Sequence, residues 1–224
     1  MNKNINLNKV LTVAGSDSGG GAGIQADIKT ITSLGGYAFS VITAVTAQNT
    51  KGVDSFIDIS SKMIEQQLDS VLTDIKPDAI KIGMLHSEDV IKSVLKSLDK
   101  IKVKKIILDP VMVAKGGAKL INDQSIKILK SYLIKKVSIL TPNIPEAEIL
   151  TGMKIKNLTD LKIAGEKIIN LGASHVVLKG GHMNTPTMSD LLIGKEVTDQ
   201  IETKKIETNH THGTGCTMAS ALAA

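Results

Sequence analysis

The sequence has 224 residues, of which 42% are hydrophobic but only 2% aromatic, which suits a single α/β domain over residues 1–224 with an aliphatic core. All 27 basic residues are lysines and the net charge is +5; without arginine or aromatic platforms, we expect no nucleic-acid partner. One cysteine cannot form an internal disulfide, and no leader or membrane-length apolar run is visible, so we expect a cytoplasmic protein without a membrane partner.

Short apolar runs rich in β-branched residues recur along the chain and predict strands. They are VLTVAG (10–15), FSVITAV (39–45), DAIKIG (78–83), KIILDPV (105–111), VSILTPN (137–143) and HVVLKGG (175–181). Segments with helical periodicity lie between most of them, at 24–34, 60–75, 88–98, 123–134 and 160–171. Continuous apolar strands that alternate with amphipathic helices predict a mostly parallel sheet covered on both faces. Near residues 190–203, two apolar stretches around Gly-Lys-Glu indicate a hairpin at the sheet edge.

Polar and glycine residues follow the predicted strands. In open α/β sheets the ligand crevice lies beyond the carboxyl ends of the strands, so a site should assemble there. The first such cluster is AGSDSGGGAGIQAD (14–27), which leads from a strand into a helix. It is not a P-loop, because no Gly-Lys-Ser/Thr follows, and a dinucleotide fingerprint lacks the acidic residue that should end the second strand. Loop amides facing a ligand and a purely structural turn both stay open.

Asp109, Asn143 and Glu146 form a candidate acidic set. Asp109 ends an apolar strand, where an isolated charge is costly without a partner or a cation. Asn143 and Glu146 stand three residues apart around Pro145. Their oxygen atoms suit Mg²⁺, often through water and phosphates. The alternative is a helix capping box, in which Asn143 caps the helix and Glu146 is its partner.

The segment THGTGCTMASALAA (211–224) contains the single cysteine. Gly213, Thr214, Gly215 and Cys216 stand at a predicted helix start, where amide groups can converge on an anion. A helix N-terminus also tends to lower the pKa of a thiol, which would favour a thiolate at Cys216. The alternative is an ordinary glycine turn with a small buried thiol.

Taken together, these motifs resemble the hydroxymethylpyrimidine kinase/phosphomethylpyrimidine kinase family of thiamin biosynthesis. The matching stretches are AGSDSGGGAGIQADIKT, AQNT (47–50), IKIGML (80–85), LDPVMVAKGG, LTPNIPEAE, VLKGGH and HGTGCT. The resemblance implies a ribokinase-like, three-layer α/β/α fold with a mostly parallel central sheet, a homodimer, and ATP and Mg²⁺ as cofactors. It implies phosphorylation of 4-amino-5-hydroxymethyl-2-methylpyrimidine and then of the resulting monophosphate.

The resemblance also implies roles for individual residues. Asp109 and Glu146 match positions that organise Mg²⁺ and phosphate, and Asn143 joins them on the nucleotide side. Lys179 and Thr208 match positions near the triphosphate. Cys216 stands where other ribokinase-like enzymes have an aspartate base, within the catalytic loop Gly213, Thr214 and Gly215. The pyrimidine pocket is matched by Gly15, Asp27, Gln48, Met84 and Val111.

Two other functions compete with this interpretation. A pyridoxine or pyridoxal kinase shares most of the motifs, although the amide of Gln48 can both give and take hydrogen bonds and so favours the aminopyrimidine. A non-catalytic pyrimidine or nucleotide sensor would be expected to have lost Asp109, Glu146 or Cys216, and all three are present. Relatives continue beyond the helix that carries Cys216, so we expect the sequence to be truncated at its C-terminus.

Overall fold

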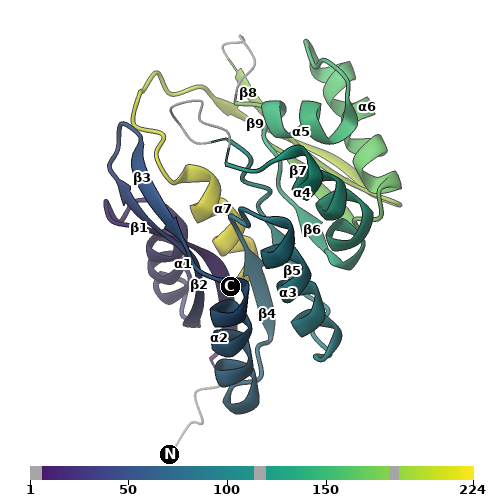
Figure 1. Cartoon of the computed structure of the whole chain (residues 1–224). Coiled ribbons are helices and arrows are strands. Elements are labelled where there is room, and N and C mark those ends of the chain that lie inside the picture. Colours follow the sequence, from purple (N-terminus) through teal and green to yellow (C-terminus); the bar gives the residue numbers. More distant parts are fainter. Residues whose placement is uncertain (1–6, 114–119, 182–186) are drawn as a thin grey trace, which may run out of the picture.

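The structure, a computed structural model, describes residues 7–113, 120–181 and 187–224 (Figure 1). Within these ranges nine strands form one sheet in the order β3-β2-β1-β4-β5-β6-β7-β8-β9. The strands are β1 (Lys9–Asp17), β2 (Tyr37–Gln48), β3 (Val53–Asp58), β4 (Ala79–Ile82), β5 (Ile106–Leu108), β6 (Ile139–Leu140), β7 (His175–Leu178), β8 (Thr187–Gly194) and β9 (Thr198–Lys204). The six central strands of this order, β2, β1, β4, β5, β6 and β7, are parallel to one another. The edge strands β3, β8 and β9 pair in antiparallel fashion. The predicted mostly parallel sheet and the predicted edge hairpin are confirmed.

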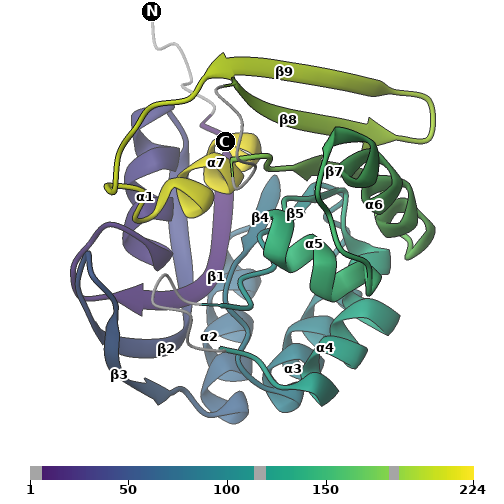
Figure 2. The ribbon, with the colours of Figure 1, turned by 90° about the horizontal axis from the view of Figure 1, so that it is seen from above.

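Helices cover both faces of the sheet, as Figure 2 shows. The helical segments are α1 (Gly23–Ser33), α2 (Ser61–Asp74), α3 (Glu88–Asp99), α4 (Asp123–Ile128), α5 (Ile144–Thr151), α6 (Leu158–Asn170) and α7 (Thr214–Ala223). The larger core cluster lies under α2 to α6, and a smaller one joins α1 and α7 to the opposite face. This is a three-layer α/β/α arrangement, with the first and last helices side by side on one face.

Two segments differ from the sequence-based prediction. The strand β3 was not predicted, because five of its six residues are exposed and its sequence VDSFID lacks the apolar alternation of a half-buried strand. The helix predicted over 123–134 begins at Asp123 but turns into a π-helical segment (Leu129–Leu133) and a short 3₁₀ turn (Ile134–Lys136). The residues 114–117 of the LDPVMVAKGG motif and His182 of VLKGGH lie outside the described ranges.

Local sequence signals explain where the helices begin and end. In α3 the side chain of Ser87 accepts a hydrogen bond from the amide of Val90, and two acidic residues occupy the first turn. In α5 a proline stands in the first turn, and Gly152 ends the helix in the left-handed conformation at φ 70°. No helix in the described ranges has the length and apolarity needed to cross a membrane.

Candidate active site

Asp109 and Lys179 meet at the carboxyl edge of the sheet, directly after β5 and β7. The Oδ1 atom of Asp109 accepts hydrogen bonds from Lys179 Nζ at 3.0 Å and from Thr141 Oγ1 at 3.2 Å. Both side chains are largely buried. A Cβ atom at Gly215 would stand 3.2 Å from Lys179 Nζ and 3.5 Å from Asp109 Oδ2. The first turn of α7 therefore rests directly on this ion pair, and a glycine gives it room to do so.

Asn143 and Glu146 form the capping box that the sequence offered as the structural alternative. Asn143 Oδ1 accepts from the Glu146 amide, and Glu146 Oε2 accepts from the Asn143 amide, both at 2.9 Å. A β-bridge joins Asn143 to Lys179, so this helix start lies beside the Asp109–Lys179 pair. The capping role and a ligand-binding role do not exclude one another, because each Glu146 oxygen has more than one lone pair.

The protonation of Glu146 is strongly perturbed. Burial is the main cause and the carboxylate of Asp109 adds to it, so the pKa of Glu146 is raised to about 7 despite the nearby ammonium of Lys179. Burial alone would lower the pKa of Lys179, but Asp109 and Glu146 outweigh it and the pKa is raised. Two buried carboxyl groups thus share one lysine, and the cluster is short of positive charge.

This shortage is the observation that tests whether a metal ion fits the site. A hard divalent cation would supply the missing charge, and carboxylate and amide oxygens are its preferred ligands. Among the described residues, no group of three or more His, Cys, Asp and Glu side chains is placed to hold a metal ion. Two carboxylates and an amide oxygen nevertheless fit a cation of the Mg²⁺ type, which takes only one or two carboxylates and completes its shell with water and phosphate; here Asp109, Glu146 and Asn143 would hold it.

The second glycine loop (residues 211–215) leads into α7, as predicted. Gly213 precedes the helix at φ 78°, and no side chain of the described residues caps the first turn. The first amides of a helix have no partner within it, and the helix dipole adds positive potential there. The amide of Thr214 already donates to the oxygen of Thr211 at 3.3 Å, so the amides of Gly215 and Cys216 are the ones that can receive an anion next to Lys179.

The expectation of a thiolate at Cys216 is wrong for this environment. The side chain is only partly exposed, and burial raises the pKa of the thiol above its ordinary value. The carboxylates of Asp109 and Asp27 raise it further, while Lys81 acts in the opposite direction. The helix N-terminus is thus outweighed, and Cys216 is mainly a neutral thiol at neutral pH.

The predicted pyrimidine-pocket residues other than Asp27 lie around the ends of β1, β2, β4 and β5. A Cβ atom at Gly15 would lie 3.7 Å from the terminal methyl of Met84. The backbone oxygen of Met84 accepts from Thr43 Oγ1, and Val111 is half-buried just beyond Asp109. Gln48 ends β2, and its Oε1 accepts from Thr46 Oγ1 at 3.0 Å.

Thr208, predicted near the triphosphate, is exposed in the segment before α7, where its hydroxyl accepts from the amide of His210. Ligand contacts for these residues stay predictions.

Asp27 is placed differently from the other predicted pocket residues, because it is completely buried. Lys81 Nζ lies 2.8 and 2.9 Å from its two oxygens, Ser220 Oγ donates at 2.7 Å, and Thr12 Oγ1 also donates. Every side of the carboxylate is engaged by protein groups. In this geometry Asp27 does not offer itself to a ligand; it joins α1, β1, β4 and α7 beneath the pocket.

Asp17 and Lys81 also contact the site: Asp17 stands at a strand end where the sequence predicts a site, whereas Lys81 was not predicted as a site residue. Asp17 is 2% exposed and connects the two glycine-rich segments, and Lys81 is the fully buried partner of Asp27. Lys81 carried a usable signal, because a lysine inside the apolar run DAIKIG must find a buried anion. For Asp17 the sequence indicates the position at a strand end but not the partner, because His212 is 195 residues away.

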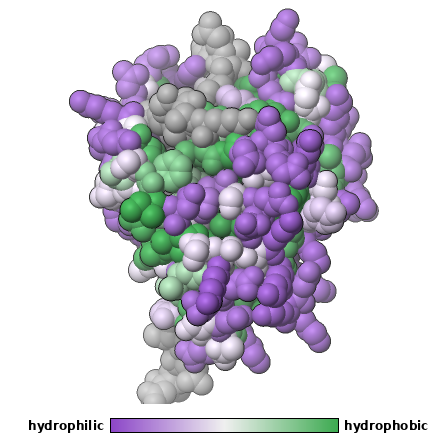
Figure 3. Space-filling view, viewed as in Figure 1, coloured by the Kyte–Doolittle hydropathy of each residue, from purple (hydrophilic) through white to green (hydrophobic). Residues whose placement is uncertain are grey.

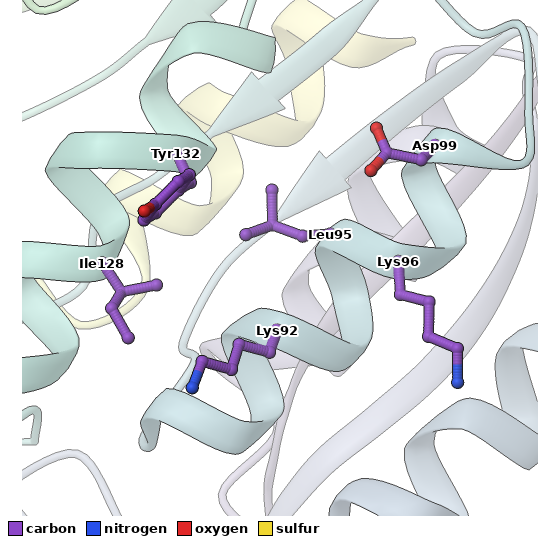
Figure 4. Close-up of a pocket in the computed structure, with 6 residues that line it drawn as sticks. All are labelled: Lys92, Leu95, Lys96, Asp99, Ile128 and Tyr132. Atoms are coloured by element: carbon purple, nitrogen blue, oxygen red, sulfur yellow. The ribbon is translucent and has the colours of Figure 1, made fainter.

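A hollow lies between α3 and the α4–π segment, away from this edge of the sheet (Figure 4). Its volume is about 470 Å³, and it is lined by Lys92, Leu95, Lys96, Asp99, Ile128 and Tyr132. Its three charged side chains already have surface partners: Glu88, Glu65 and Lys136. The hollow thus contains none of the convergent buried groups that mark the carboxyl edge of the sheet.

The fold and the site define a phosphotransferase of the ribokinase-like class: an anion-binding helix start, a buried lysine and two carboxyl groups meet at the edge of a parallel sheet. The chain matches the family Phosphomethylpyrimidine kinase over residues 17–224. It is 50% identical over 221 residues to the hydroxymethylpyrimidine/phosphomethylpyrimidine kinase of Bacillus subtilis (strain 168), covering 98% of this chain and 82% of the relative. The chain therefore belongs to the phosphomethylpyrimidine kinase family.

Solved structures support the same fold. The crystal structure of phosphomethylpyrimidine kinase from Clostridium difficile 630 is 45% identical, with a TM-score of 0.84 over 96% of this chain and 88% of that one. A pyridoxal kinase from Bacillus subtilis, solved as an ADP complex, is 35% identical, with a TM-score of 0.89 over 97% of this chain and 83% of that one. The ribokinase-like prediction is confirmed, and membership of a kinase family implies a nucleotide phosphate donor.

Proposed function

We propose that this protein transfers a phosphoryl group from ATP, with Mg²⁺, to the hydroxymethyl group of 4-amino-5-hydroxymethyl-2-methylpyrimidine and then to the monophosphate, in thiamin diphosphate biosynthesis in the cytoplasm. The observation that carries the proposal is the contact of the α7 start with the Asp109–Lys179 pair. Phosphoryl transfer depends mainly on positioning and electrostatic stabilisation, and this contact supplies both.

The groups of the site have separate roles in the proposed phosphoryl transfer. The amides at the start of α7 and the ammonium of Lys179 stabilise negative charge on the transferred group. Asp109, Glu146 and Asn143 would hold Mg²⁺, which when bound neutralises phosphate charge. The chain contains no arginine, so an arginine finger within the chain is excluded. Because the thiol of Cys216 is mainly neutral, its contribution as a base is small. The alcohol proton leaves late in a loose transition state and passes to an oxygen of the transferred phosphoryl group.

Release of ADP tests the proposal directly. It is measured in parallel with the pyrimidine alcohol, its monophosphate and pyridoxal, with Asp109→Asn as the inactive control. We expect turnover of both pyrimidines and little with pyridoxal. Turnover of neither alcohol would contradict the kinase proposal and leave a non-catalytic sensor, whereas turnover of the alcohol alone would remove the second phosphorylation.

Pyridoxal phosphorylation is the second candidate, because a pyridoxal kinase has the same fold at 35% identity. Gln48 favours the pyrimidine, because a side-chain amide can both donate to a ring nitrogen and accept from the neighbouring amino group. We expect Gln48→Met to lower kcat/KM for the pyrimidine alcohol by about 10- to 100-fold, as for loss of a substrate hydrogen bond. Equal kcat/KM for wild type and variant would remove Gln48 from the pocket.

We also propose a homodimer. On the face shown in Figure 3, apolar side chains gather over β2 and β3. Val45 of β2 and Ile57 of β3 pair across these two strands and are 47% and 74% exposed. No strand of the described residues pairs with the outer edge of β3, and exposed apolar patches often mark interfaces. Light scattering of the purified protein, with Ile57→Lys as the disrupting variant, tests this; a monomeric wild type at micromolar concentration would contradict it.

A further inference from the structure

The two glycine-rich segments of the site are joined by one buried contact. The first glycine loop (residues 18–22) follows β1, and the second glycine loop (residues 211–215) precedes α7. Asp17 Oδ2 and His212 Nε2 lie 2.8 Å apart, and their side chains are 2% and 10% exposed. The contact spans 195 residues of sequence, so it is a tertiary feature rather than a local turn.

Asp17 also organises the first glycine loop. Its carboxylate accepts hydrogen bonds from the amides of Gly19 at 2.8 Å, Gly21 at 3.0 Å and Ala22 at 2.8 Å. The pKa of Asp17 is lowered: burial would raise it, but the hydrogen bonds from His212 and the three amides outweigh burial. The carboxylate is thus ionised and fully engaged, and His212 is its only partner outside the first glycine loop among the described residues.

The backbones of the two loops touch at the same place. A Cβ atom at Gly213 would stand 1.7 Å from the oxygen of Gly21, and one at Gly21 would stand 2.5 Å from His212 Cδ2. These distances leave no room for a side chain on either glycine. The two loops therefore form one packed unit, in which a shift of one loop must move the other.

We propose that His212 is a positioning residue, which through Asp17 fixes the second glycine loop against the first and so sets the distance between the acceptor alcohol and the transferred phosphoryl group. This inference rests on the proposed function, which places the alcohol near Gly15 and the phosphoryl group at the start of α7. Displacing reacting atoms by about 1 Å can cost about 100-fold in rate. Loosening the contact should therefore lower kcat more than it raises either KM.

Two amide variants provide a matched test. In His212→Gln the amide nitrogen reaches about as far as Nε2 of histidine, whereas in His212→Asn the shorter side chain stops near the position of Nδ1. We expect His212→Asn to lower kcat by about 10- to 100-fold with less than a threefold change in KM for ATP and for the pyrimidine alcohol. His212→Gln should restore kcat to within about threefold, since the donor is regained. His210→Gln, an exposed position two residues away, is the control and should match wild type.

Wild-type turnover of the pyrimidine alcohol tests the proposed function separately from this inference. Thermal unfolding of each variant separates positioning from folding, because a purely structural histidine would lower the melting temperature and leave kcat of the folded enzyme unchanged. Wild-type kcat in His212→Asn, equal losses in the Asn and Gln variants, or a loss confined to KM would each overturn the positioning role. If His212→Asn does not fold, Asp17→Asn replaces it, and the same split between kcat and KM decides.

Discussion

Replacing Glu146 by glutamine should make the ligand-free protein more stable and the enzyme inactive. The carboxyl group is 3% exposed, and its pKa of about 7 in the folded state compares with 4.5 for an unperturbed glutamate. A folded-state pKa above the unfolded value means that the folded protein binds this proton more tightly. The protonated form therefore stabilises the fold, and this stability is lost as pH rises from about 4.5 through about 7.

The magnitude follows from the same two values. At 1.36 kcal/mol per pKa unit, the difference between 4.5 and about 7 corresponds to about 3 kcal/mol as an upper bound. Glutamine keeps the capping box, because its side-chain oxygen can still accept from the Asn143 amide. We therefore expect the stability difference between Glu146→Gln and wild type to grow by about 1 to 3 kcal/mol between pH 5 and pH 8.5.

Urea unfolding without nucleotide and in the presence of a chelator measures this difference. All other titratable groups are common to both proteins, so their contributions cancel in the comparison. A stability difference that does not change between pH 5 and pH 8.5 would refute the argument that burial raises the pKa of Glu146. Activity should be lost in the variant, because a neutral amide supplies less charge to a cation.

Three further variants probe other contacts. Gly213→Ala should destabilise the fold strongly, because the new methyl group would clash with the oxygen of Gly21. Gly152→Ala is the control: this glycine also has a positive φ of 70° but open space around it, so the loss of stability in thermal unfolding should be only about 1 to 2 kcal/mol. Equal losses in the two variants would contradict the clash. Lys81→Met should cost about 3 to 5 kcal/mol in urea unfolding, because it leaves a buried carboxylate unpaired, against at most about 1 kcal/mol for the exposed Lys100→Met. Cys216→Ala should lower kcat by about 10-fold or less, and a loss above about 100-fold would show a catalytic thiolate after all.

The central strands and most helices could be predicted because their signals are local. Apolar runs such as VLTVAG and the proline and capping residues around α5 report on a few neighbouring residues. The exposed strand β3 gave no such signal, because its pairing with β2 rather than its own pattern makes it a strand. Likewise, nothing local in the segment 123–134 distinguishes a regular helix from one that widens into a π turn.

The candidate site could be predicted in composition but not in electrostatics. The sequence placed Asp109, Glu146 and the second glycine loop at one edge of the sheet. It could not show that the thiol of Cys216 would be buried close to the carboxylates of Asp109 and Asp27. Burial first, and these carboxylates in addition, reverse the expected pKa shift of Cys216. Asp27 illustrates the same limit, because its partners Lys81 and Ser220 lie 54 and 193 residues away.

The long-range contacts of α7 have a consequence for how the protein is made. The hydrogen bond between Asp27 and Ser220 cannot form until 193 further residues have been synthesised after Asp27. The contact between Asp17 and His212 likewise requires 195 further residues. At about 5 to 20 residues per second on a ribosome, that interval is about 10 to 40 seconds. During this interval the first glycine loop and the sheet face of β1, β4 and β5 that α7 later covers stay exposed. We expect chaperone binding to concentrate in this interval and to end when α7 emerges.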